Sequence, residues 1–550
     1  MTIDSRRMKR IISRIIAVSR GLLMDDEELP KVFVRRATGL RRELGSLFAL
    51  SYPLNLVVGP WMFLSIPIAL VSNPGGDIII ALALGAVPFM IYMMNALFLA
   101  VAMPRSGGDY MWISRCVNPA IGYVFNGFGS LAMSLIVLGL VALIITQILG
   151  FCLLIIGVSF IPAFIGPALV LMSNAINMPR LAVAIIITIF FVAINALGPK
   201  PMKWTNYTFF AITMIFSVLL FLVLGFTNPS QVPTTWDSVW GSGAYQEIID
   251  TAAAAGWASA SFDFGSTLGA MRELYFLYIG GTALGFFGSE IKVPKKSFSV
   301  GYMGGIVLIV GIYIGFSALL LSRYGEFVSM YSYVMLGEVP TTINPYIFPM
   351  ANVFAVSLTP NPILQFMLAL GPAIWAMAFF PAMLPGMTRL LFSMSFDRFL
   401  PERLTRISEK THAPYVASIV IGVSAIASIF LYAFAGFIAG ALNVIAISSI
   451  THFLQGLASF TLPFSRPAVW KSGFGYTLKA IPVISILGLL TMCFSGFFMA
   501  FFTMLVADVF SIAVGSVLIG ISFAVYAYYA WKNQKEGMPV SKLLGEIPPA

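Results

Sequence analysis

Long uncharged apolar stretches constrain this chain most strongly, and the first of them, residues 50–70, is interrupted in its middle. It reads LSYPLNLVVGPWMFLSIPIAL and is long enough to cross a lipid bilayer. Regular helix is not expected at Val58-Gly59-Pro60-Trp61, because glycine is permissive and proline lacks an N–H and clashes with the preceding turn. A second stretch, residues 274–291, is interrupted at Gly280-Gly281. Broken backbone at membrane depth survives only where it is buried in protein or lines a cavity.

The composition places the chain in a membrane. Hydrophobic residues make up 59% of its 550 residues and charged residues only 10%, whereas a soluble domain carries about 25% charged residues. The apolar runs are continuous and about 20 residues long, as in transmembrane helices, and do not alternate over about ten residues as in a membrane β-barrel. The sequence therefore predicts an all-α integral membrane protein.

We expect about twelve transmembrane helices, with both termini in the cytoplasm. Region 116–179 is the most ambiguous, because it could hold a second short span or an apolar external loop. The expected spans are 47–70, 78–102, 122–156, 181–197, 205–227, 267–290, 300–322, 363–395, 415–435, 437–462, 480–502 and 508–531.

The placement of basic residues supports this topology. All but three of the 32 Lys and Arg residues fall in the segments expected to be cytoplasmic, the exceptions being Arg180, Arg272 and Arg323. This is the positive-inside pattern of membrane proteins. It accounts for the net charge of +10 without a nucleic-acid partner.

The segments outside the spans divide into tails and loops. Residues 1–44 form a basic cytoplasmic segment, in which residues 6–23 read either as an amphipathic helix on anionic lipid or as a frayed tail. Residues 532–550 form a cytoplasmic tail. The outside connections 228–266 and 323–362 are long enough to be lids, although the first reads equally well as a passive surface loop.

Several functional classes lack their sequence signature. The three cysteines give no disulfide framework or metal spacing, and we expect neither a metal nor a cofactor. The sequence has no HExxH, GxSxG or P-loop motif, which argues against an enzyme or a nucleotide-driven pump. It also shows no repeated filter or charged ring of a channel.

One connection carries a specific motif. Residues 102–119 read AMPRSGGDYMWISRCVNP, which closely resembles the signature of the amino acid–polyamine–organocation permease family. Three shorter stretches resemble the same family in the right order, namely residues 195–200, 290–294 and 388–401. The resemblance covers about residues 40–535.

The resemblance implies a LeuT-like fold and a transport function. It implies two inverted five-helix repeats, here residues 45–227 and 267–462, followed by two accessory helices within residues 463–531. Members of this family move amino acids, polyamines and related amines by alternating access, some of them coupled to H⁺ or Na⁺. The expected partners are therefore a small-molecule substrate and the lipid bilayer.

The resemblance also places the substrate at the two interruptions. A half-helix N-terminus attracts a carboxylate and exposed carbonyls attract an ammonium group, so such a site can hold a zwitterion without charged side chains. Ordinary helix packing is the alternative for the aromatic residues, and close packing of small residues is the alternative for the glycine pair. The residues implied are Val58, Gly59, Pro60, Trp61, Phe276, Tyr278, Ile279, Gly280, Gly281 and Thr282.

The chain departs from the family pattern at the site and at the coupling positions. Pro60 removes a donor where a carboxylate would bind, Trp61 replaces a small residue, and Thr282 stands where relatives often carry Glu. The fifth span has no Lys and the eighth has no Ser or Thr between residues 366 and 387, so the expected residues for H⁺ and Na⁺ coupling are both absent.

A few polar residues near the membrane suggest further roles. Arg105, Asp109, Glu290 and Lys292 could form a cytoplasmic gate network, with a solvated surface charge as the alternative for Glu290. His452 could relay a proton or could simply form an interhelical hydrogen bond.

The sequence thus predicts a secondary transporter for amino acids or related amines in a cell membrane, with a prokaryotic plasma membrane as the simplest location. An amine exchanger or uniporter without ion coupling remains an alternative, as does a transporter-derived sensor.

Overall fold

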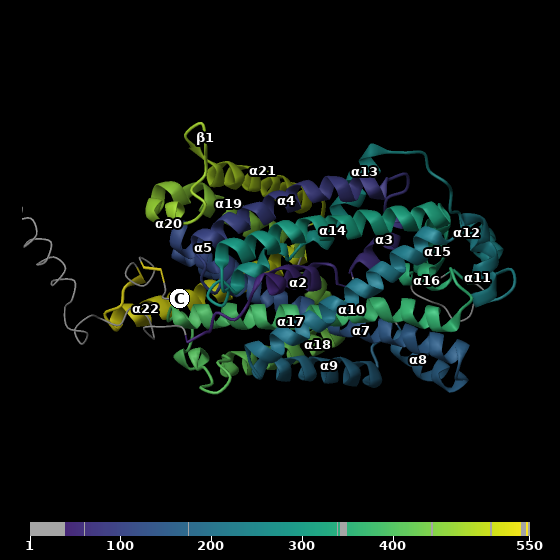
Figure 1. The fold of residues 1–550 in the computed structure, drawn as a ribbon, viewed down its shortest axis with the longest axis horizontal. Helices are drawn as coiled ribbons and strands as arrows, with labels where there is room; N and C mark the ends of the chain where they lie inside the picture. The colour runs from purple at the N-terminus through teal and green to yellow at the C-terminus, as the bar shows by residue number, and fades with distance from the viewer. Residues whose placement is uncertain are drawn as a thin grey trace, which may run out of the picture.

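The computed structural model is a bundle of long helices (Figure 1). It describes residues 39–59, 61–173, 175–337, 339–340, 349–441, 444–506, 509–540 and 546–547. The basic segment predicted to hold an amphipathic helix lies almost wholly outside the described residues. Among these residues, the only strands are β1 (Thr477–Leu478) and β2 (Ile481–Pro482), which pair as a small antiparallel hairpin. The predicted all-α membrane fold is confirmed.

Ten helical segments within the described residues are long and apolar enough to cross a membrane. The predicted sixth span is divided into shorter helices, and the predicted tenth corresponds to α19, so the total of twelve stays a prediction. The helices in or near the predicted spans are α2 (Ser46–Val57), α3 (Trp61–Ser72), α4 (Ile78–Ala102), α7 (Ser130–Ser159), α9 (Met178–Ala196), α10 (Pro199–Phe226), α13 (Phe264–Leu274), η4 (Tyr275–Tyr278), η5 (Gly281–Phe286), α14 (Pro294–Tyr324), α17 (Pro362–Phe396), α18 (Tyr415–Ala441), α19 (Val444–Ser465), α21 (Val483–Val506) and α22 (Val509–Lys535).

Both predicted interruptions are present. The α-helix α2 ends at Val57 and α3 begins at Trp61, and Gly59 between them has a φ of +25°. In the second interruption α13 gives way to the 3₁₀ turns η4 and η5, and Gly280 between these turns has a φ of +101°. Pro60 lies outside the described residues. Glycine suits these positions because L side chains rarely adopt a positive φ.

The ambiguous region after Cys116 contains one long helical segment followed by short apolar helices. Residues 119–159 form one continuous helical segment, which runs through α6 (Pro119–Ile121), the π-helix η1 (Gly122–Gly129) and α7. The apolar residues that follow form the short elements η2 (Pro162–Phe164) and α8 (Ile165–Met172), which pack against α7. The apolar segment after α7 is therefore a connection and not a second long span, but this connection is helical.

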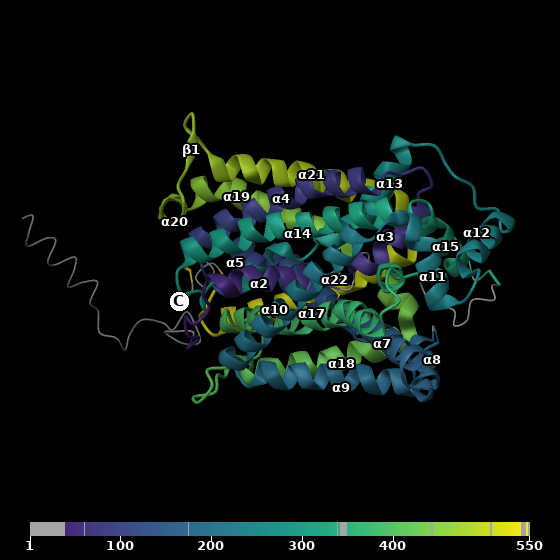
Figure 2. The ribbon, with the colours of Figure 1, turned by 45° about the vertical axis from the view of Figure 1, so that its right-hand side comes forward.

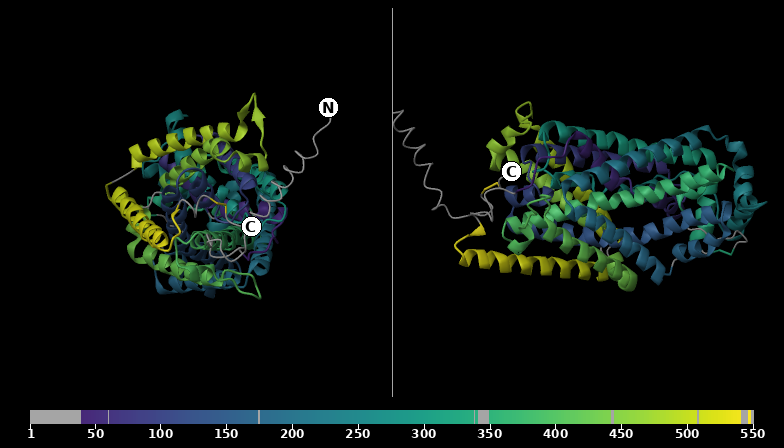
Figure 3. Two further views of the ribbon diagram at one scale, coloured as in Figure 1. Left: turned by 90° about the vertical axis from the view of Figure 1, so that its left-hand side faces the viewer. Right: turned by 60° about the horizontal axis from the view of Figure 1, so that its bottom comes forward.

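The two ends of the bundle differ in structure. One end carries α5 (Gly108–Cys116), the 3₁₀ turn η6 (Glu402–Thr405), α20 (Pro467–Ser472) and the hairpin (Figure 1). The other carries α8, η3 (Pro229–Gln231), α11 (Val232–Trp240), α12 (Ala244–Ala254), α15 (Phe327–Leu336) and α16 (Ala351–Val356) (Figure 2). The accessory helix α22 runs along the outside of the bundle (Figure 3).

The long connections form a packed helical cap at this second end. The indole of Trp236 on α11 is only 1% exposed. It contacts the rings of Phe327 and Tyr331 on α15 with centroids 4.9 and 5.4 Å away, and that of Phe354 on α16 at 6.0 Å. The connection 228–266 is therefore not a loose surface loop.

A buried ion pair fastens α5 to α17 at the first end. The guanidinium of Arg115 donates two hydrogen bonds of 2.6 and 2.7 Å to the two carboxylate oxygens of Asp397, and both side chains are fully buried. The hydroxyl of Tyr110 donates a third bond of 2.7 Å to the same carboxylate. The pair thus holds the connection after α4 against the end of α17.

Replacing one member of this pair should destabilise the protein. Because Asp397→Asn leaves the Arg115 charge buried without its counter-ion, we expect the free energy of unfolding to fall by about 3–5 kcal/mol, as measured by unfolding of the purified protein in detergent. The control Glu536→Gln removes the exposed Lys532–Glu536 pair and should cost about 0.5 kcal/mol or less. Equal effects of the two substitutions would contradict this account.

Candidate functional site

The two helix interruptions are joined by one hydroxyl group. Tyr313 on α14 places its Oη 2.8 Å from the carbonyl oxygen of Val57, at the end of α2, and 2.9 Å from that of Leu277 in η4. The hydroxyl can donate to only one of these carbonyls at a time. A carbonyl without a partner in the membrane interior costs free energy, so this position lets one side chain serve both interruptions.

A second tyrosine of α14 serves the other side of the Gly280 interruption. The Tyr302 hydroxyl donates a 3.0 Å hydrogen bond to the carbonyl of Thr282 in η5. Tyr302 and Tyr313 are both fully buried. Helix α14 packs along α2 and α4, so it is the element that holds the two interruptions together.

A small cavity of about 130 Å³ opens between the interruptions. Its walls come from α2, α3, α5, α7, η4, η5, α17 and α19. Most of the lining is apolar or aromatic. The lining residues that also matter for the argument below are Trp61, Asp109, Phe276, Gly280, Thr282, Phe286, Phe379, Thr451 and His452.

The structure brings half of the predicted substrate residues to this cavity. Those that line it are Trp61, Phe276, Ile279, Gly280 and Thr282. Val58 and Gly59 are buried beside it without lining it. Pro60 is outside the described residues, so its predicted role is not addressed by the structure.

The two remaining predicted residues take part in helix packing. The Tyr278 hydroxyl donates a 2.9 Å hydrogen bond to the carbonyl of Leu82 on α4, and its ring lies 4.9 Å from that of Phe89. Gly281 also faces α4, because a Cβ there would come within 2.7 Å of Phe89. Tyr278 and Gly281 therefore occupy the packing positions that the sequence left as alternatives, and their substrate role stays a prediction.

An aromatic pair spans the cavity from one interruption to the other. The rings of Trp61 and Phe276 meet edge to face, with centroids 4.7 Å apart and an interplanar angle of 86°. Trp61 begins α3, directly after the first interruption, and Phe276 lies in η4, just before the second. The pair closes one side of the cavity and would have to separate for a larger solute to pass.

The carboxylate of Asp109 also lines this cavity. Asp109 is in the first turn of α5, a helix that lies between the predicted spans, and only 7% of the residue is exposed. Its Oδ1 atom has no hydrogen-bond partner among the described residues. Burial raises the pKa of this carboxyl to about 7.

His452 on α19 lines the same cavity. Its ring stacks on that of Tyr92 with centroids 4.4 Å apart, and its Nδ1 is buried without a partner among the described residues. The predicted interhelical hydrogen bond is therefore not formed through Nδ1. The proton-relay role stays a prediction.

Glu290, one of the four residues predicted to form a cytoplasmic gate, is paired with a residue outside that set, and the gate network stays a prediction. Glu290 is 1% exposed, so it is not a solvated surface charge, and it accepts hydrogen bonds of 2.8 and 3.0 Å from the Arg389 guanidinium. Lys292 is exposed, and Arg105 donates a 3.2 Å bond to the carbonyl of Pro104. Sequence reasoning missed Arg389, although it stands in one of the family-like stretches.

Backbone hydrogen bonds join the segment before α2 to the segment after η5 at the α5 end of the bundle. The Leu44 N–H donates to the carbonyl of Glu290 at 3.0 Å, and the Lys292 N–H donates to the carbonyl of Leu44 at 2.9 Å. The Ser106 and Ser289 hydroxyls are also hydrogen-bonded to each other. Together with the Glu290–Arg389 pair, these contacts hold the segments around Leu44, Ser106 and Glu290 against one another.

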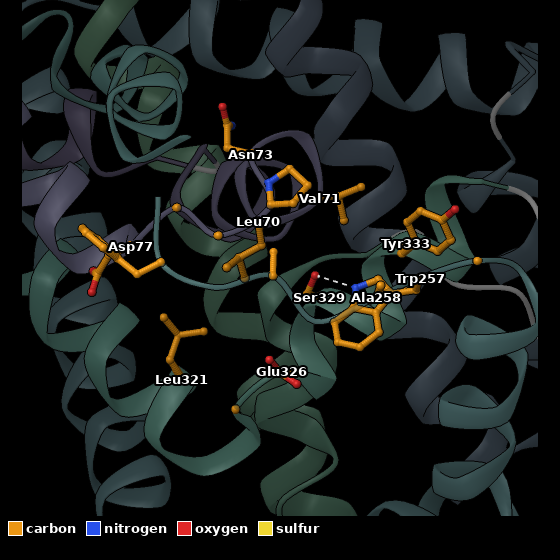
Figure 4. A pocket seen from close by; sticks show the side chains of 17 residues that line it. Leu70, Val71, Asn73, Asp77, Trp257, Ala258, Leu321, Glu326, Ser329 and Tyr333 are labelled. Atoms are coloured by element: carbon orange, nitrogen blue, oxygen red, sulfur yellow. Dashed lines mark hydrogen bonds between the residues drawn. The ribbon is translucent and has the colours of Figure 1, made fainter. Parts of the chain in front are cut away.

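A larger cavity of about 550 Å³ lies at the other end of the bundle (Figure 4). Its lining includes Asn73, Asp77 and Glu326, and the Trp257 indole N–H donates a 3.1 Å hydrogen bond to the Ser329 hydroxyl beside it. The helix interruptions do not contribute to its walls. We therefore regard it as a vestibule and place the candidate binding site in the smaller cavity.

Comparison with known proteins identifies the family of this chain. Residues 52–536 match the model of a family described as amino acid permease. The chain belongs to the amino acid permease family. An uncharacterized transporter of Mycobacterium tuberculosis (strain ATCC 25618 / H37Rv) is 21% identical over 496 residues, which is 88% of this chain and 91% of the relative.

Another relative has a more specific name. The serine/threonine exchanger SteT of Bacillus subtilis (strain 168) is 22% identical over 509 residues, which is 90% of this chain and 98% of that protein. The matches cover almost the full length of both chains. Family membership and these names identify this permease as a membrane transporter of small molecules, as the sequence predicted.

The positive φ of Gly280 leads to a direct test. A Leu side chain at this positive φ would strain the backbone by about 1–2 kcal/mol, and it would project from the wall of the cavity. We therefore expect Gly280→Leu to reduce uptake into proteoliposomes at least tenfold while leaving membrane insertion intact. The control Gly311→Leu lies in open space on α14 and should retain uptake. Normal uptake by the Gly280→Leu variant would show that the site lies elsewhere.

The shared hydroxyl of Tyr313 can be removed without changing the ring. Tyr313→Phe leaves carbonyls of both interruptions without this donor, so we expect the free energy of unfolding to fall by about 1–3 kcal/mol and uptake to slow. Tyr415→Phe, on a side chain that is 37% exposed, is the matched control. A Tyr313→Phe protein with parental stability and uptake would refute the bridging role.

Proposed function

We propose that this permease is a secondary transporter that moves amino acids or related amines by alternating access. The substrate would bind in the cavity between the two helix interruptions. The observation that carries the proposal is the convergence of Trp61, Phe276 and Gly280 on that cavity, since these residues flank two interruptions far apart in the sequence.

The arrangement of closures supports alternating access. We assign the barrier on the α5 side to the Leu44–Glu290 backbone pairing and the Glu290–Arg389 ion pair. We assign the barrier on the vestibule side to the Trp61–Phe276 pair, because α3 runs from Trp61 to Leu70 and Val71 in the lining of the vestibule. A transporter of this kind would open one barrier while the other stays closed.

Exchange of one substrate for another is the mode we favour over ion-coupled uptake. The sequence lacks the residues expected for H⁺ or Na⁺ coupling in its fifth and eighth spans. The serine/threonine exchanger among the relatives is consistent with this mode.

Uptake measurements test the proposal directly. The purified full chain would be reconstituted in proteoliposomes and supplied with a panel of labelled amino acids and amines, with and without internal counter-substrate, a sodium gradient and a pH gradient. We expect uptake of at least one solute to rise at least severalfold with internal counter-substrate and to change little with either gradient.

Two outcomes would count against this proposal. No flux of any amino acid or amine, with empty liposomes and Gly280→Leu proteoliposomes as controls, would refute the transport function. Uptake that requires a sodium or proton gradient, and that internal substrate does not accelerate, would refute the exchange mode alone. A transporter-derived sensor would bind a solute in the same cavity without moving it.

A further inference from the structure

Asp109 differs from the other deeply buried carboxylates described at the α5 end of the bundle. Asp397 is paired with Arg115 and Glu290 with Arg389, each through two hydrogen bonds. Asp109 is buried to a similar depth, but one of its oxygens has no partner among the described residues and the side chain faces the cavity. A buried carboxylate without a counter-ion is costly for a protein to keep.

The cavity itself offers no compensating cation. None of its described lining residues is Lys or Arg, and His452 is the only other lining residue with an ionisable side chain. The neighbouring wall is aromatic. Phe286 packs directly on the backbone of Gly108, since a Cβ on that glycine would come within 2.8 Å of the Phe286 ring.

Three backbone carbonyls at the interruptions lie within hydrogen-bond distance of tyrosine hydroxyls. Those of Val57 and Leu277 share the Tyr313 hydroxyl, and that of Thr282 accepts from Tyr302. An ammonium group entering the cavity therefore meets fewer open acceptors on the backbone than the interruptions alone would provide. The Asp109 carboxylate remains as the strongest acceptor on the wall, because charge-assisted hydrogen bonds are the stronger ones.

We propose that Asp109 binds the ammonium group of the substrate, and that this permease accepts small apolar monoamines whether or not they carry a carboxylate. This inference rests on the proposed transport function. The carboxylate completes a site that is otherwise apolar and aromatic, with Trp61, Phe276 and Phe379 on its walls. Aromatic faces attract organic cations in addition to covering their alkyl chains.

The same wall explains why a substrate carboxylate is dispensable. The described lining contains no basic side chain for an anion to pair with, other than His452. At the first interruption, where a half-helix N-terminus would supply N–H donors, Pro60 provides none. The negative charge of Asp109 would also repel a solute that has a carboxylate and no amine.

Three ligands of similar size separate these contributions. Leucine carries both groups, 3-methylbutylamine lacks the carboxylate, and 4-methylpentanoate lacks the amine. Equilibrium binding of each tritiated ligand would be measured on the purified full chain by scintillation proximity. We expect 3-methylbutylamine to bind at least as tightly as leucine and at least tenfold more tightly than 4-methylpentanoate. Tighter binding of 4-methylpentanoate, or no binding of the amine, would overturn the proposal.

Substitutions then assign the effect to one carboxylate. Asp109→Asn should weaken amine binding at least tenfold, and Asp109→Glu, which keeps the charge, should bind the amine better than Asp109→Asn. The control Asp250→Asn changes an exposed carboxylate on α12 and should bind like the parent. Amine binding by Asp109→Asn within twofold of the parent would overturn the proposal.

The two proposals fail in different ways. Amine binding that depends on Asp109 without flux in proteoliposomes would refute transport and leave the ammonium site standing. Uptake of leucine by a chain that does not bind 3-methylbutylamine would leave transport standing and refute the ammonium site. If Asp109→Asn does not fold, the three ligands tested on the parent chain still decide the question.

Discussion

The need to satisfy broken backbone at membrane depth governs this structure. Two interruptions, at Gly59 and Gly280, remove regular helical hydrogen bonds where water cannot replace them. Helix α14 compensates with two buried tyrosines, of which Tyr313 reaches a carbonyl of each interruption. Helix α14 thus bonds to both interruptions that flank the cavity, so the candidate binding site and the packing of the bundle depend on the same contacts.

Charge is distributed around that cavity in two ways. At the α5 end of the bundle, Arg115–Asp397 and Glu290–Arg389 are fully paired and fasten connections to α17. Asp109, on the same helix as Arg115, has no such partner for one of its oxygens and faces the cavity. The paired charges therefore stabilise the packing of the bundle, while we propose that the incompletely paired Asp109 binds a solute.

The interruptions, the membrane fold and the family could be predicted from the sequence, because their signals are local. These signals are glycine and proline, the long apolar runs and the PRSGGDY stretch. Contacts between distant segments are not local. Nothing near Glu290 indicates that its partner is Arg389, ninety-nine residues away, and nothing near Asp109 indicates that it faces the cavity. The same limit applies to Tyr278, whose hydroxyl turns out to bind the Leu82 carbonyl on α4.

The position of a bound substrate tests the central claim most directly. A cryo-electron microscopy map of the full chain in lipid nanodiscs, saturated with a solute that it transports, would show where the solute sits. The account predicts density between Trp61 and Phe276, against Gly280. Density confined to the larger vestibule lined by Trp257 and Glu326, with the cavity between the interruptions filled only by protein, would contradict it.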